Sequence, residues 1–222
     1  MDIRKYFNVL NCKNETNSHT ENETDTDTEN DYDLVEEEPK KQTETFKFKK
    51  TIQVFTDGSS FNNGSKTKKH SGGIGVFFGK NHPYNKSIKI KDEPITNNIA
   101  ELKACILAIT TIIENKNCFN KDNCPIDIEI YTDSEYVINS ITKWAKLWKF
   151  NGWKKKEGNK LTEIKNKDLI IELYELYDKI KPKFKHVRAH RTEPKNKFSK
   201  EYSEWYGNYM ADKLATQASN SV

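Results

Sequence analysis

Four carboxylates stand at positions where an acidic side chain is unusual. Asp57 and Asp133 each follow a run of alternating apolar residues that is typical of a β-strand. Glu101 lies in the first turn of a predicted helix, and Asp212 lies inside the last predicted helix. A lone Asp before a Gly is commonly a surface turn residue. A carboxylate at the end of a central strand, however, is costly to bury unless a cation or donor meets it. Four such residues together favour a shared site.

A shared site of this composition would bind divalent cations. If the strands of Asp57 and Asp133 are neighbours, their side chains can converge, and Glu101 can face the same sheet. Asp212 follows Trp205 by one heptad on the same helix face. Clustered carboxylates repel one another unless they share cations, and oxygen-only ligands suit Mg²⁺ or Mn²⁺ rather than zinc. Two such ions about 4 Å apart can activate a water and stabilise the leaving oxygen of a phosphodiester.

Apolar periodicity predicts the elements that hold these residues. Strands at 51–57, 72–79 and 87–91, separated by loops, predict an antiparallel meander. A stripe of apolar residues spaced three and four apart from Ile99 to Ile113 predicts a helix. The same patterns then predict a strand at 126–130, a helix from Ser134 to about Ala145, a helix at 169–177, a strand at 184–189 and a helix at 202–218. This order predicts a mixed α/β (α+β) fold, with a five-stranded mixed sheet and helices on both faces.

The charge of the chain changes sign along its length. Residues 1–45 of the 222 carry 13 acidic and 5 basic side chains, net −8, whereas the remainder is net +12. The leader has too few apolar anchors to offset ordering entropy, so we expect residues 1–48 to be disordered and 49–219 to form one catalytic domain. A basic domain indicates a polyanionic partner such as nucleic acid, the alternative being a merely soluble Lys-rich surface.

The first residues form a short basic and aromatic motif. Ile3, Tyr6 and Phe7 resemble the hydrophobic-x-x-aromatic-aromatic core of a sliding-clamp-binding peptide, without the Gln that usually precedes it. Such a peptide inserts three apolar anchors on one helical turn into a pocket. The alternative is an ordinary amphipathic N-terminus, since short motifs match loosely.

Cysteine usage and hydropathy indicate an intracellular protein. The four cysteines form no C-x-x-C pair, so reduced thiols are expected. No apolar run approaches the roughly 20 residues that cross a bilayer, and no signal-peptide core is present. We therefore expect a monomer in the cytoplasm or nucleus with no membrane partner.

Five motifs in order resemble the signatures of type 1 ribonuclease H. They are Asp57-Gly-Ser59, Thr96-Asn-Asn-Ile-Ala-Glu-Leu102, Tyr131-Thr-Asp-Ser134, His186-Val-Arg-Ala-His190 and Asn208-Tyr-Met-Ala-Asp-Lys-Leu-Ala215. Their order and spacing agree across about 52–218, nearly the whole globular part. The resemblance implies the ribonuclease H-like fold.

The resemblance also implies an activity. In this family the four carboxylates hold two Mg²⁺ ions, for which Mn²⁺ can substitute, and the RNA strand of an RNA/DNA hybrid is hydrolysed to 3′-hydroxyl and 5′-phosphate ends. His190 matches a mobile-loop histidine that helps product or metal departure. Removal of replication primers and removal of R-loops are both compatible with this activity. The alternatives are a non-catalytic hybrid-binding module and a DNA nuclease of the same fold.

Substrate contacts follow from the same resemblance. Asn63, Asn97 and Asn98 fall where the family reads 2′-hydroxyls, and Thr96 and Asn166 match a pocket for a DNA phosphate. Pro94 replaces the basic residue of that pocket. The residues beside the carboxylates, Gly58, Ser59 and Ser134, are also assigned to substrate binding. Turn or cap chemistry is the alternative for the Asn residues.

A Trp- and Lys-rich segment resembles the basic protrusion that holds the DNA strand. It contains Trp144, Trp148 and Trp153 among six lysines between positions 143 and 156. Lysines neutralise phosphates, and a Trp offers a flat face to deoxyribose. Helix packing is the alternative for at least one Trp. The loops at 157–165 and 191–203 are longer than is usual in the family and have no assigned function.

Overall fold

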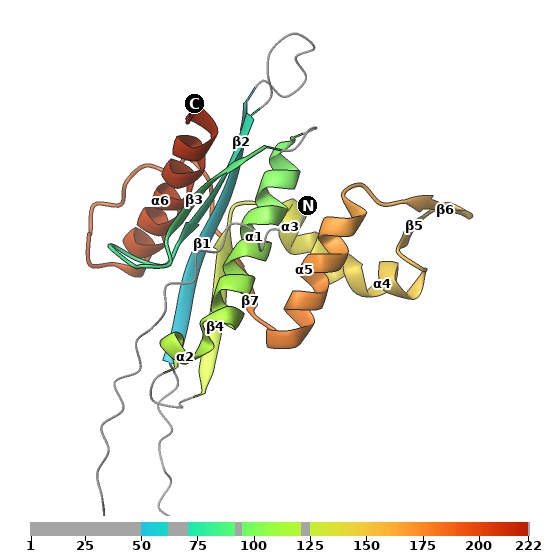
Figure 1. The fold of residues 1–222 in the computed structure, drawn as a ribbon, viewed down its shortest axis with the longest axis horizontal. Coiled ribbons are helices and arrows are strands. Elements are labelled where there is room, and N and C mark those ends of the chain that lie inside the picture. Colours follow the sequence, from blue (N-terminus) through green and yellow to red (C-terminus); the bar gives the residue numbers. More distant parts are fainter. Residues whose placement is uncertain (1–49, 62–70, 92–94, 121–124, 222) are drawn as a thin grey trace, which may run out of the picture. The chain divides into compact units, whose positions relative to one another are not determined.

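A mixed sheet forms the centre of the structure, a computed structural model that describes residues 50–61, 71–91, 95–120 and 125–221 (Figure 1). The strand order is β3-β2-β1-β4-β7. The strands of this sheet are β1 (Lys50–Phe61), β2 (Ser71–Phe77), β3 (Lys86–Ile90), β4 (Ile126–Thr132) and β7 (Lys183–His186). The helices are α1 (Asn97–Glu114), α2 (Lys116–Phe119), α3 (Glu135–Asn139), the π-helical η2 (Ser140–Trp144), α4 (Ala145–Phe150), α5 (Lys167–Ile180) and α6 (Lys200–Asn220).

Strand pairing brings the ends of β1 and β4 together. β1 pairs with β2 and β2 with β3 in the antiparallel sense, whereas β1–β4 and β4–β7 are parallel. This confirms the predicted five-stranded mixed sheet. Phe55 lies opposite Tyr131 in the β1–β4 register. Asp57 and Asp133 each follow that pair by two residues, so both reach the same end of the sheet.

Helices cover both faces of the sheet, as predicted. Figure 1 shows α6 on one side of the sheet and α1 and α5 on the other. α1 lies against β1, where the Thr56 Oγ1 and Cys105 Sγ atoms are 3.3 Å apart. α6 crosses β2 so closely that a Cβ on Gly75 would lie 2.0 Å from the Ala211 carbonyl oxygen. Glycine is needed there because no side chain fits between strand and helix.

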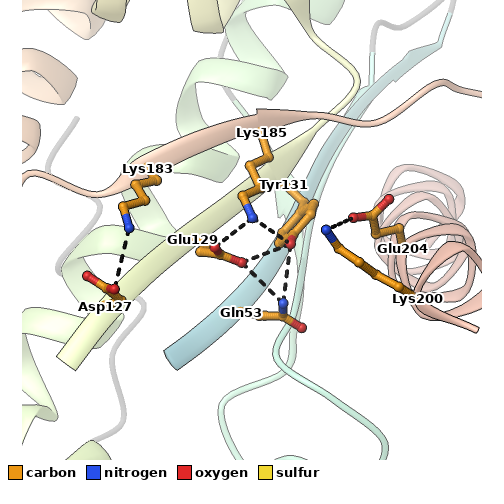
Figure 2. A network of polar contacts seen from close by, with 8 residues as sticks. All are labelled: Gln53, Asp127, Glu129, Tyr131, Lys183, Lys185, Lys200 and Glu204. Carbon is orange, nitrogen blue, oxygen red and sulfur yellow. Dashed lines mark hydrogen bonds and ion pairs between the residues drawn. The ribbon is translucent and has the colours of Figure 1, made fainter. Parts of the chain in front are cut away.

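The core beneath α6 continues into a polar network that links β1, β4 and β7. Phe55 and Tyr131 stack with ring centroids 4.6 Å apart. The Tyr131 hydroxyl donates to Glu129 Oε2 at 2.9 Å, and Lys185 Nζ lies 2.6 Å from Glu129 Oε1 (Figure 2). Gln53 Nε2 also donates to Glu129 Oε2 at 3.2 Å. The hydrogen bond from Lys185 is the main reason that the pKa of Glu129 is lowered.

Three parts of the chain differ from the sequence prediction. The 157–165 loop is largely a hairpin of β5 (Lys154–Glu157) and β6 (Lys160–Glu163), whose two-residue turn uses Gly158 at φ 61°. The last strand ends at His186 rather than Ala189, because β4 ends at Thr132 and offers no further partner. The helix after Ser134 extends beyond Ala145 to Phe150 through the π-helical turn of η2.

Cys118 forms a disulfide, which contradicts the expectation of reduced thiols, whereas Cys105 is a free buried thiol. No helix within the described ranges combines the length and apolar character needed to cross a membrane. The motif of Ile3, Tyr6 and Phe7, together with Asn63 and Pro94, lies outside the described residues.

Candidate active site

All four predicted carboxylates line one open cavity of about 720 Å³. Asp57 comes from β1, Glu101 from α1 and Asp212 from α6, while Asp133 follows β4. Residues separated by more than 150 positions in the chain therefore meet at one end of the sheet. This arrangement is consistent with the prediction that the four side chains share a site.

Glycine and two hydrogen bonds position the carboxylates. A Cβ on Gly58 would lie 2.2 Å from the Ala100 carbonyl carbon, so Gly58 permits the approach that brings Glu101 beside β1. The Gly58 amide donates to Asp57 Oδ1 at 2.8 Å. Ser134 caps α3 by accepting from the Val137 amide at 3.3 Å, and its hydroxyl donates to Glu101 Oε2. The site therefore depends on backbone contacts as much as on its acids.

Burial and mutual repulsion disfavour charge on these carboxylates. Asp57 is 9% exposed. Burial, followed by the charges of Asp133 and Asp212, raises the pKa of Asp57 to about 8. Burial also raises the pKa values of Glu101 and Asp133. The hydrogen bond from Ser134 opposes the rise at Glu101, as one from Asn208 does at Asp133. A cation at this site would stabilise the ionised forms.

The donor chemistry of the cavity fits Mg²⁺, although the side chains do not form a ready-made coordination shell. Among the described residues, no three His, Cys, Asp or Glu side chains are close enough to hold one ion. Carboxylate oxygens are the ligands that Mg²⁺ prefers, and the buried Asn208 Oδ1 has no hydrogen-bond partner in the described part of the chain. The residues present therefore fit a hard cation.

His190 lies at the rim of the same cavity. It is exposed and sits in the turn after β7 with φ at 50°, a left-handed conformation that is uncommon for His. The next residue is fixed to α6, because the Trp205 indole donates to the Arg191 carbonyl at 2.9 Å. His190 is therefore at the site, on a turn that α6 holds in place.

The other predicted substrate residues divide between the cavity and structural positions. Gly58, Ser59 and Asn97 line the cavity. Ser59 Oγ also donates to the Ala215 carbonyl at 3.1 Å, and Asn97 Oδ1 accepts from Ser60 Oγ at 2.6 Å. Thr96 is the N-cap of α1, where it accepts from the Ile99 amide at 3.3 Å. Asn98 is exposed on the first turn of α1 but does not line the cavity.

A second, apolar cavity of about 350 Å³ lies beside the Trp- and Lys-rich segment. Its lining includes Trp144, Trp148 and Tyr136, with Lys155 and Lys165. Asn166, predicted to bind phosphate, precedes α5 and donates to the Tyr136 hydroxyl at 3.2 Å. Two of the three predicted Trp residues therefore line one cavity.

Trp153 lies apart from that cavity. Its ring meets Tyr174 of α5 edge to face, with centroids 5.9 Å apart. This contact agrees with the packing alternative for one Trp of the segment.

Sequence reasoning missed several residues that line the carboxylate cavity. The most informative are Arg188, Arg191, Trp205, Asn208 and Tyr209. Asn208 could have been predicted from the sequence, because it precedes Asp212 by one helical turn and so shares its face of α6. The aromatic pair carried no such signal, because Trp205 and Tyr209 also fit the apolar pattern of a packed helix.

Comparison with known proteins identifies the family. Residues 49–220 match the sequence model of RNase H. The chain is 35% identical to a ribonuclease H of Schizosaccharomyces pombe over 75% of this chain and 52% of that protein. It is also 35% identical to a ribonuclease H of Clostridium botulinum over 76% of this chain and 95% of that one. The match spans about half the length of the fission yeast and mammalian relatives.

A solved structure shares the fold. It is a foamy viral protease-reverse transcriptase in complex with an RNA/DNA hybrid, with a TM-score of 0.56 and 25% identity, covering 77% of this chain and 20% of that one. The family model, these relatives and the shared fold agree with the motifs that line the cavity. The chain therefore belongs to the ribonuclease H family.

Proposed function

We propose that this chain hydrolyses the RNA strand of RNA/DNA hybrids, using two Mg²⁺ ions held by Asp57, Glu101, Asp133 and Asp212. The observation that carries the proposal is the convergence of these carboxylates, from three elements and one turn, on a single open cavity. Relatives that are named ribonuclease H and a structural neighbour bound to an RNA/DNA hybrid support the substrate class.

Two Mg²⁺ ions held by these carboxylates would supply activation of the attacking water and stabilisation of the leaving oxygen. The chain's own residues hold the ligands in place. The Gly58 amide orients Asp57, and the Ser134 hydroxyl orients Glu101. The side chain of Asn208 does the same for Asp133. His190 is exposed at the rim, and its imidazole can carry a proton to the departing 3′-hydroxyl. The products are then 5′-phosphate and 3′-hydroxyl ends.

In this proposal the carboxylate cavity binds the RNA strand and the apolar cavity binds the DNA strand. Asn97 lines the carboxylate cavity, and its amide can both donate to and accept from a 2′-hydroxyl, which only the RNA strand carries. Trp144 and Trp148 give the apolar cavity flat faces for deoxyribose, with Lys155 and Lys165 beside them for phosphate. This division would explain selectivity for a hybrid over either pure duplex.

The decisive experiment compares a labelled RNA/DNA hybrid, duplex DNA and duplex RNA, each with Mg²⁺. We expect cleavage of the hybrid in its RNA strand only. Asp57→Asn should abolish cleavage while retaining hybrid binding, because it removes a metal ligand without removing substrate contacts. Cleavage of duplex DNA with the hybrid left intact would instead assign the chain to the DNA nucleases of this fold, and wild-type activity in Asp57→Asn would refute the metal site.

A further inference from the structure

A third cavity opens directly beside the carboxylates. Its volume is about 890 Å³, and it shares Arg188, Ala189, His190 and Arg191 with the carboxylate cavity. The rest of its wall comes from the segment between β7 and α6, including Lys195 and Ser199, and from Glu201 in the first turn of α6. This is the long 191–203 segment to which the sequence assigned no function. A strand that lies on the carboxylates can therefore continue into this cavity without leaving the surface.

The wall of this cavity is held in place by α6. The Trp205 indole donates to the Arg191 carbonyl at 2.9 Å, and the Arg191 guanidinium pairs with Glu201 in the first turn of α6. Ser199 caps α6 by accepting from the Tyr202 amide at 3.1 Å, and its hydroxyl donates to the Asn196 carbonyl at 2.7 Å. The segment therefore forms a defined surface at the entrance of the helix.

The charged side chains of this cavity that form no ion pair with a described residue are cations. Its two acids already have cations, since Glu201 pairs with Arg191 and Glu193 lies 3.8 Å from Lys197. Arg188 and Lys195 form no side-chain hydrogen bond or ion pair with any residue that the structure describes. Two uncommitted cations favour an anionic ligand, and a guanidinium suits phosphate in particular. The cavity volume is in the range of about 300–1,000 Å³ that accommodates a ligand larger than a single ion.

An aromatic pair lines the carboxylate cavity, and its Trp205 is hydrogen-bonded to Arg191 of the wall that the two cavities share. Trp205 and Tyr209 stack with ring centroids 5.5 Å apart and planes 9° from parallel. Both line the carboxylate cavity, and Tyr209 is 46% exposed. Flat aromatic faces beside cations are the arrangement that supports a nucleic acid strand by stacking and phosphate contact.

We propose that the cavity formed by Arg188–Arg191 and the segment up to Glu201 binds the sugar–phosphate backbone of the RNA strand next to the cleavage point. The strand is assigned as RNA because the cavity continues from the carboxylates, so this inference rests on the proposed function. Arg188 and Lys195 contact phosphates, and the Trp205–Tyr209 pair supports the nucleotide between them and the carboxylates.

The test measures hybrid binding in the Asp57→Asn background with EDTA, so that neither cleavage nor metal is required. Arg188→Ala combined with Lys195→Ala should raise the Kd for a long hybrid about tenfold at moderate salt. It should also reduce the slope of log K against log salt by about 1.5, as expected for two lost phosphate contacts. The control, Lys80→Ala combined with Lys116→Ala, removes the same charge from exposed positions outside all three cavities and should leave this slope nearly unchanged.

Shortening the hybrid identifies the contact. The RNA strand is shortened stepwise from each end, and the Kd for the hybrid is measured for the protein that retains Arg188 and Lys195. Shortening from one end only should raise this Kd until it equals that of the Arg188→Ala/Lys195→Ala variant. Equal binding by the double variant and the control would overturn this inference while leaving the proposed function intact. Failure of the Asp57→Asn background to prefer hybrid over duplex DNA would instead count against the proposed function.

Discussion

At the scale of single residues, Asp57 shows how burial and like charge act together. The side chain is nearly enclosed and faces the charges of Asp133 and Asp212, and together these raise its pKa from 3.8 to about 8. The neighbouring amide of Gly58 opposes the rise. A carboxylate in such surroundings favours the protonated state until a cation is present, so the proposed metal-ligand role of Asp57 and the stability of the chain without metal are in conflict.

This conflict predicts how stability without metal depends on pH. Between about pH 4 and 8, the unfolded chain has released the Asp57 proton while the folded chain retains it, so the free energy of unfolding falls as pH rises. Asp57→Asn removes that dependence. In EDTA at pH 8 we expect the variant to melt about 2–6 °C above the wild type. Thermal melts at pH 5 and 8 test this; a wild-type advantage that grows toward pH 8 would contradict it.

At the scale of elements, the glycines of β1 and β2 set how closely the two long helices approach. A Cβ on Gly58 would meet the backbone of α1, and one on Gly75 would meet the backbone of α6. Those helices carry Glu101 and Asp212, so the distance between helix and strand decides whether the carboxylates share a cavity. The network around Glu129 links β1, β4 and β7 through the side chains of Gln53, Glu129 and Lys185 (Figure 2).

Gly58→Ala should therefore move α1 and Glu101 away from Asp57. We expect a loss of stability of about 1–3 kcal/mol from overpacking and a larger loss of hybrid cleavage than of hybrid binding. Gly79→Ala is the matched control: its Cβ has nothing within 4 Å, and only the φ of 150° is strained. Urea unfolding and cleavage rates check both variants, and equal activity of Gly58→Ala and Gly79→Ala would show that the helix approach is not limiting.

Glu129→Gln should weaken the network of Gln53, Tyr131 and Lys185. The pKa of Glu129 is lowered in the folded state, so its contribution is present above the unfolded value of 4.5 and is lost as pH falls through the lower folded value. We expect about 1–2 kcal/mol of destabilisation at pH 7, shrinking below pH 4.5. Glu163→Gln, which breaks an exposed pair with Lys154, should cost less than half as much. Urea unfolding at pH 7 and pH 4 decides, and a pH-independent loss would contradict this account.

At the scale of the whole molecule, one end of the sheet carries the carboxylates while the Trp- and Lys-rich segment extends to the side (Figure 1). Trp144 and Trp148 stand over an apolar cavity, with ring centroids 5.5 Å apart. Trp153 instead packs on α5. Similar residues in one segment therefore have different surroundings, and their substitution should separate binding from folding.

Trp148→Ala should raise the KM for hybrid by about tenfold, since an aromatic stack contributes roughly 1–3 kcal/mol per base, with little change in melting temperature. Trp153→Ala should lower the melting temperature by several degrees through lost packing and change KM less. Steady-state kinetics and thermal melts of both variants test the distinction. The reverse pattern would mean that Trp153, and not Trp148, faces the substrate.

The types of most elements and the identity of the four carboxylates could be predicted from the sequence alone. Strand and helix periodicity is local, so Asp57, Asp133 and Glu101 could be placed at strand and helix ends before any pairing was known. The resemblance of the surrounding motifs then placed all four acids in one site, and the cavity agrees with this.

Strand pairing, and the loops that form cavity walls, became known only from the folded structure. The parallel pairing of β1 with β4, the end of β7 at His186 and the hairpin of β5 and β6 depend on partners distant in the chain or on the geometry of a turn. The cavity beside His190 likewise arises because Trp205 and Glu201 of α6 fix the segment before it. Such contacts cannot be predicted from periodicity, because periodicity reports only the local geometry of a helix or strand and these contacts join residues far apart in the chain.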